Sequence, residues 1–164
     1  TELQFELATL HHEGRHLPKD VARAAVWYRK AATEGHAPAQ LNLALMLLEG
    51  EGIKLDPVEA HKWLLQAAEQ GDSEGQVALG MMFALGQGIQ ADLVQAHKWV
   101  TLSSKSGNED AATALKQLNT KLTAEQLVES AKLVKEWEAQ QIEPEPKPSE
   151  PAAKESEPTT TAGK

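Results

Sequence analysis

Five consecutive residues near the start of the chain, His12-Glu13-Gly14-Arg15-His16, match the H-E-x-x-H motif of zinc proteases. In that motif both histidines bind one zinc ion from the same face of a helix, and the glutamate acts as the general base. Gly14 and the nearby Pro18 predict instead that the helix breaks between the two histidines. Because no third ligand with suitable spacing is evident, we expect no metal site, no cofactor and no catalytic residue.

Two further histidines, His61 and His97, each lie in the sequence Ala-His-Lys-Trp. A position that recurs along a chain favours a repeated structural role over catalysis, which has no reason to recur. The Gly-Glu-Gly and Gly-Gln-Gly segments are not expected to bind phosphate, because they follow predicted helices and no Gly-Lys-Ser/Thr is present. They predict turns with positive φ angles. The sequence therefore favours a protein that is not an enzyme, with a metal-dependent hydrolase as the least favoured alternative.

The composition excludes several other classes of protein. The 164 residues include 16 Lys and Arg and 24 Asp and Glu, and this net charge of −8 argues against a nucleic-acid-binding surface. The absence of cysteine excludes disulfides, iron–sulfur clusters and thiolate zinc sites. No apolar run reaches the roughly 18 residues of a membrane span, so no transmembrane segment is expected.

The tryptophans reveal an internal repeat. Trp27, Trp63 and Trp99 are separated by steps of 36 residues. The same step relates four more columns, which are Gly14, Gly50 and Gly86; Gly35, Gly71 and Gly107; Asp20, Asp56 and Asp92; and Ala24, Ala60 and Ala96. A fixed period of roughly 20–50 residues indicates a stacked array of structural repeats.

Each unit is predicted to be a pair of helices. In the second unit the first helix spans about residues 38–49 and ends at the Gly50-Glu51-Gly52 turn. The second helix begins after Asp56, a good N-cap, with Glu59 placed to complete a capping box, and it ends near Gly71. No segment alternates with period two over enough residues for a strand, so the fold is expected to be all-α.

The fourth unit, residues 109–141, departs from this pattern. No Gly-x-Gly turn follows its first helix, and a second helix is predicted to begin at Thr123, which has capping-box spacing to Gln126. Its apolar side includes Trp137, which lies 38 residues after Trp99. We interpret this helix as a cap that closes the core of the array. Residues 142–164 are rich in Pro, Glu, Ser, Thr and Lys and are predicted to form a disordered tail.

The repeated pattern resembles the Sel1-like repeat, a relative of the tetratricopeptide repeat. In the second unit the residues that carry the resemblance are Ala39, Leu43, Ala44, Gly50, Gly52, Ile53, Asp56, Ala60, Trp63, Ala67, Ala68 and Gly71. The third unit has Ser103 and Ser104 in place of two alanines, and the first has His16 in place of the second loop glycine. The resemblance implies a right-handed α-solenoid of helix-turn-helix repeats at residues 1–36, 37–72 and 73–108, followed by a C-terminal capping helix.

The first helix of the second unit is apolar on two sides. On a helical wheel, Leu41, Leu45 and Leu48 lie opposite Leu43, which belongs to the expected core. In tetratricopeptide-like arrays this helix lines the concave surface, so the resemblance implies a partner-binding groove there. The matching positions in the other units are Phe5, Thr9 and His12, then Val77, Met81 and Ala84, and finally Thr113, Gln117 and Thr120. The alternative is that neighbouring helices cover these side chains.

These patterns predict a non-catalytic scaffold or adaptor that binds a protein or peptide segment in the groove. A structural component of a bacterial envelope or secretion assembly is the main alternative. We expect a monomeric bacterial protein that does not bind nucleic acid. The resemblance and the absence of an initiator methionine favour export to the periplasm, with the cytoplasm left open as an alternative.

Overall fold

The computed structural model describes residues 1–142, which contain eight α-helices. In chain order they are α1 Glu2–Glu13, α2 Val21–Thr33, α3 Ala37–Glu49, α4 Pro57–Glu69, α5 Ser73–Leu85, α6 Leu93–Lys105, α7 Glu109–Asn119 and α8 Ala124–Gln141. No strand occurs among these described residues, and the expected all-α solenoid is confirmed. The predicted tail lies outside the described residues, apart from its first residue, Ile142.

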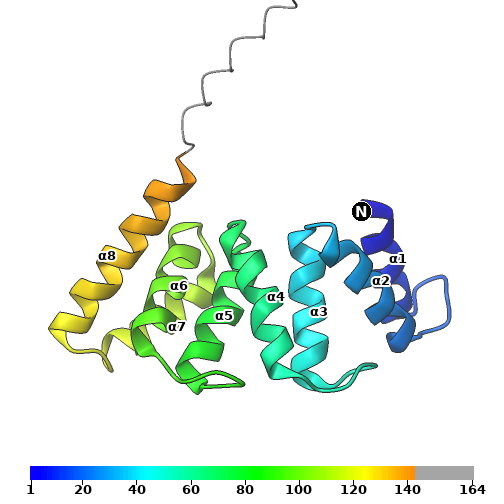
Figure 1. The fold of residues 1–164 in the computed structure, drawn as a ribbon, viewed down its shortest axis with the longest axis horizontal. Coiled ribbons are helices and arrows are strands. Elements are labelled where there is room, and N and C mark those ends of the chain that lie inside the picture. The colour runs from blue at the N-terminus through cyan, green and yellow to red at the C-terminus, as the bar shows by residue number, and fades with distance from the viewer. Residues whose placement is uncertain (143–164) are drawn as a thin grey trace, which may run out of the picture.

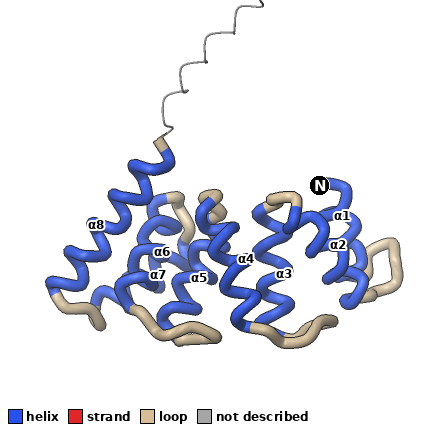
Figure 2. Tube along the Cα trace, in the orientation of Figure 1, coloured by secondary structure: helices blue, strands red, loops and turns tan. Residues whose placement is uncertain are grey.

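The helices form a row of pairs that runs from α1 and α2 at one end to α7 and α8 at the other (Figure 1). From α1 to α7, helices adjacent in sequence pack together, and further contacts join α3 to α5 and α6 to α8. The odd-numbered and even-numbered helices therefore form two layers. Figure 2 shows the longer loops within the second and third pairs along one edge of the row, and the short turns between pairs along the opposite edge.

An aspartate fixes the start of each of the helices α2, α4 and α6. Its carboxylate accepts a hydrogen bond from the backbone N–H three residues ahead, at 2.9–3.0 Å. The three capping residues are Asp20, Asp56 and Asp92. A cap of this kind contributes about 1 kcal/mol. Because each aspartate marks the residue at which a helix begins, the 36-residue spacing of the aspartates sets the spacing of these helices.

Glu59 does not complete the capping box that the sequence predicts. Its carboxylate accepts hydrogen bonds from the Arg29 guanidinium on α2 and, at 3.1 Å, from Nε1 of Trp63. The Arg29 contact is the largest cause of a lowered Glu59 pKa. The side chain thus joins the first pair of helices to the second instead of capping its own helix.

The Gly-x-Gly turns have the predicted positive φ angles, and their second glycine also allows a close contact. Gly52 has a φ of +68°, and a Cβ atom built on it would lie only 2.6 Å from the carbonyl carbon of Val21, at the start of α2. Gly88 has the same relation to Pro57 at the start of α4. His16 occupies the equivalent place in the first pair, is exposed, and has a φ of +60°.

Buried glutamines link successive pairs through the core. The Nε2 atom of Gln40 donates to the Ala32 carbonyl at 3.1 Å, and Nε2 of Gln76 donates to the Ala68 carbonyl at 3.2 Å. Each bond connects an odd-numbered helix to the preceding even-numbered helix. Sequence analysis did not single out this position, although Gln40 and Gln76 show the same 36-residue step as the glycines.

Helix α8 covers the far end of the array. Its Trp137 meets Trp99 of α6 edge to face, with ring centroids 6.3 Å apart. The Nδ1 atom of buried His97 is 2.8 Å from Oγ of Ser130 on α8. Its Nε2 atom is 2.9 Å from Oδ1 of Asn119 at the end of α7. The capping box predicted at the start of α8 is present. This helix is therefore held by both aromatic packing and a buried polar contact.

Candidate functional site

The H-E-x-x-H segment does not form a zinc-protease site. Helix α1 ends at Glu13, and Gly14 adopts a left-handed conformation with a φ of +76°, as the sequence predicts. The Nε2 atom of His12 is instead 3.1 Å from Oε2 of Glu51, which lies in the loop of the second pair. His16 lies beyond the break, so the two histidines do not share one helical face. Within residues 1–142, no group of three or more His, Asp or Glu side chains is placed to hold a metal ion.

The two histidines of the Ala-His-Lys-Trp segments have different surroundings. His61 is half-buried and meets Phe83 edge to face, with ring centroids 5.7 Å apart, and this burial lowers its pKa. His97 makes the contacts with α7 and α8 described above. Both histidines serve packing, but the repeat does not give them the same partners, because α8 replaces a regular repeat helix next to His97.

A small hollow lies between α3, α5 and the start of α7. Its volume is about 220 Å³, and it is lined mainly by apolar side chains together with two exposed carboxylates, Glu74 and Asp110, which we call its rim. We call it the central hollow. Its lining residues are Leu41, Leu45, Glu74, Val77, Ala78, Asn108 and Asp110.

The leucines of α3 differ in how much surface they offer. Leu45 is 39% exposed, whereas Leu41 is only 6% exposed and Leu48 is half-buried. Leu41 belongs to the buried hydrophobic core cluster instead of the surface. In α5, Met81 is 42% exposed, and Val77 and Ala84 are half-buried. The exposed apolar surface at the centre of this face is therefore smaller than it would be if all three leucines were exposed.

The predicted residues of the first pair make contacts within the fold. Phe5 packs on His36 and Tyr28, with ring centroids 4.6 and 5.7 Å away. The Thr9 hydroxyl donates to the Phe5 carbonyl at 3.1 Å and lies 3.2 Å from the Tyr28 hydroxyl. Burial raises the pKa of Tyr28. Phe5 and Thr9 line a pocket of about 420 Å³ that shares no lining residue with the central hollow.

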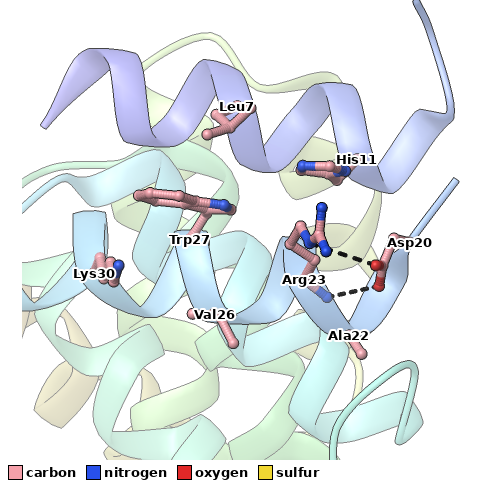
Figure 3. Close-up of a pocket in the computed structure, with 8 residues that line it drawn as sticks. All are labelled: Leu7, His11, Asp20, Ala22, Arg23, Val26, Trp27 and Lys30. Carbon is pink, nitrogen blue, oxygen red and sulfur yellow. Dashed lines mark hydrogen bonds and ion pairs between the residues drawn. The ribbon is translucent and has the colours of Figure 1, made fainter. Parts of the chain in front are cut away.

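A larger pocket, of about 660 Å³, lies between α1 and α2 at the end of the array (Figure 3). Figure 3 shows the Trp27 indole between the two helices, with Leu7 and His11 on the α1 side. This pocket was not expected, because the period of the tryptophans predicts that Trp27 packs between units. The residues 36 positions after Leu7 and His11 are Leu43 and Leu47, which are fully buried. Leu7 and His11 thus occupy positions that are core in the second pair, whereas the other six lining positions recur 36 residues later as the lining of a second pocket of about 620 Å³.

Comparison with known proteins accounts for this architecture. The family model of the Sel1 repeat matches three consecutive segments, residues 1–36, 37–72 and 73–108. The chain belongs to the Sel1 repeat family. Sel1 repeats typically form scaffolds for protein–protein interaction and are generally non-catalytic, so protein partners are the general expectation for this Sel1 repeat chain.

Two solved structures share the fold. A Sel1 repeat protein from Oxalobacter formigenes is 32% identical, with a TM-score of 0.67, and the match covers 70% of this chain and 47% of that one. A protective antigen of uropathogenic Escherichia coli with an SLR fold is 27% identical, with a TM-score of 0.69, and the match covers 93% and 43% of the two chains. This Sel1 repeat chain thus spans less than half the length of either protein, and both sources are bacterial. No curated protein matched the chain.

The described part of the Sel1 repeat chain includes no helix that is both long and apolar enough to span a membrane.

Proposed function

We propose that this chain is a non-catalytic Sel1 repeat scaffold that binds a segment of a partner protein on the face of its odd-numbered helices. The central hollow supplies the anchoring site. The observation that carries the proposal is a pair of partly exposed apolar side chains on neighbouring helices. Leu45 lines the hollow, and Met81 lies one helical turn after Val77, which also lines it.

The repeat itself does not require apolar residues at these two positions. The same column holds Thr9 in the first unit and Gln117 in the fourth, so a polar side chain is compatible with the fold. The core side of α3 is already supplied by fully buried Leu43 and Leu47. A contiguous apolar patch on the surface marks an interaction site, and we propose that Leu45 and Met81 belong to such a patch.

The size of the hollow favours a protein segment over a small molecule. Small-molecule pockets usually measure about 300–1,000 Å³, so a hollow of about 220 Å³ accommodates one side chain of a larger partner. Complete burial of Leu or Met contributes about 1.5–3 kcal/mol. Because Leu45 and Met81 are already three-fifths buried, covering them contributes about 0.6–1.2 kcal/mol each. An affinity based on these two side chains is modest, and further contacts have to add to it.

The substitution Leu45→Asp tests the proposal. Val128→Asp is the matched control, because Val128 is 71% exposed on α8, away from the central hollow. Tagged wild-type and variant proteins are crosslinked in extract of the source cells, and the captured proteins are identified by mass spectrometry. We expect Leu45→Asp to lose a partner that wild type and Val128→Asp both retain, with all three proteins equally helical by circular dichroism. Equal capture by all three folded proteins would refute the central hollow as the binding site.

A further inference from the structure

Helices α1, α3, α5 and α7 are negatively charged, whereas helices α2, α4 and α6 are positively charged. Helices α1, α3, α5 and α7 contain seven carboxylates and one lysine, which are Glu2, Glu6, Glu13, Glu49, Glu74, Glu109, Asp110 and Lys116. Helices α2, α4 and α6 contain six cations and two carboxylates, which are Arg23, Arg29, Lys30, Lys62, Lys98, Lys105, Glu59 and Glu69. The formal charge is −6 on the odd-numbered helices and +4 on α2, α4 and α6; with the capping aspartates Asp20, Asp56, Asp72 and Asp92 included, the two values are −7 and +1. An acidic composition alone does not produce this separation.

Both layers contain paired charged groups, including Glu13 with Arg15 and Glu2 with His36 on the odd-numbered side, but the carboxylates at the central hollow differ from these. On the even-numbered helices, Arg29 pairs with Glu59, and Lys105 pairs with Glu138 of α8 at 2.6 Å. At the rim of the central hollow, Glu74 and Asp110 are both exposed, and neither forms an ion pair within residues 1–142. The cations of the even layer are thus partly used inside the fold, whereas the rim carboxylates face solvent.

From this arrangement we infer that the partner segment is cationic, with one apolar anchor residue flanked by Lys or Arg. The apolar side chains of the hollow take the anchor, and the flanking cations meet Glu74 and Asp110. The remaining carboxylates of the odd-numbered helices attract such a segment, and the positive helices α2, α4 and α6 repel it. Charge complementarity of this kind directs a partner to one face and raises the rate of association. The inference rests on the proposed function, because it describes the ligand of the same hollow.

Glu74 and Asp110 also have a local role in the fold. Both lie in the first turn of their helices, where a carboxylate stabilises the positive end of the helix dipole. Neutral variants therefore need a control for stability. The double variant Glu74→Gln/Asp110→Asn removes two negative charges at the rim. The control Glu69→Gln/Glu129→Gln removes two exposed carboxylates on α4 and α8.

The probe is a peptide selected from a random display library for binding to the full chain. The enriched peptides are synthesised with a fluorescent label, and their binding is measured by anisotropy for wild type, Leu45→Ala and the two double variants. We expect enriched peptides to combine an aliphatic or aromatic residue with several Lys or Arg. We expect the rim variant to weaken binding about three- to tenfold, as for two exposed ion pairs, and the control double variant to have no effect. Raising NaCl from about 0.05 to 0.5 M weakens the same peptides, because surface charges are screened.

The outcomes separate the two proposals. Peptides that need Leu45 but carry no cationic bias, or that bind the rim variant as well as wild type, would overturn the charge inference and leave the proposed function standing. Peptides that bind wild type and Leu45→Ala equally would overturn the proposed site itself. A selection that yields no peptide specific for the wild-type protein counts against both.

Discussion

Replacing Gly52 with alanine tests how closely the loop of the second pair approaches the first pair. A left-handed φ costs an L-residue about 1–2 kcal/mol, and Gly52 has a φ of +68°. The new Cβ atom would also lie 2.6 and 2.7 Å from the carbonyl carbon and oxygen of Val21, and 2.8 Å from the Ala22 nitrogen. These are backbone atoms that cannot rotate away, and overpacking of this kind costs about 1–3 kcal/mol. We expect Gly52→Ala to lower the free energy of unfolding by about 2–5 kcal/mol.

Gly71→Ala is the matched control. Gly71 has a φ of +84°, but a Cβ atom there meets nothing within 4 Å, so only the conformational cost of about 1–2 kcal/mol applies. Urea unfolding followed by circular dichroism measures both variants, and each kcal/mol corresponds to about 2–4 °C in Tm for a chain of this size. Equal destabilisation by the two substitutions would show that the close approach of Gly52 to α2 does not contribute, and the reasoning would fail.

Two further predictions concern the histidines of the Ala-His-Lys-Trp segments. His97→Ala removes the contacts with Ser130 and Asn119 and leaves buried Ser130 without its partner, which lowers the free energy of unfolding by about 1–3 kcal/mol. We expect amide hydrogen exchange to accelerate more in α8 than in α2. Uniform acceleration in both helices would contradict a local role for His97. Burial lowers the pKa of His61 below 6.5, so its neutral form stabilises the fold above pH 6.5 and this contribution is lost as the pH falls through the lowered pKa. The unfolding free energy of wild type should therefore fall more between about pH 7 and 5 than that of His61→Gln, and an NMR titration showing an unshifted His61 would disprove the cause.

The sequence predicts the helices well because their ends depend on neighbouring residues. The predicted first helix of the second unit, residues 38–49, is observed as Ala37–Glu49, and Asp56 caps the next helix as expected. Capping and left-handed turns involve side chains and backbone groups within a few residues of each other. A 36-residue step in such residues is therefore sufficient to place each helical pair.

The candidate surface was harder to predict because exposure depends on non-local packing. A helical wheel assigns Leu41 and Leu45 to the same face, but Leu41 is buried in the core cluster whereas Leu45 is partly exposed. Glu59 shows the same effect, since Arg29 from the preceding pair displaces its expected local contact. The separation of charge between layers is visible in the sequence only after each residue has been assigned to its helix.

The repeats differ at the second glycine of the Gly-x-Gly turn, which is Gly52 in the second unit, Gly88 in the third and His16 in the first. They are therefore not equally suited to duplication. A tandem copy of residues 37–72 would place its Gly52 against the start of the second helix in the preceding unit. This is the contact that Gly52 makes with Val21 and Gly88 makes with Pro57. A copy of residues 1–36 inserted in the interior would instead bring the His16 side chain against the start of a preceding helix. Lengthening of the solenoid by internal duplication is therefore compatible with its second and third units, and its first unit becomes interchangeable with them only after His16→Gly.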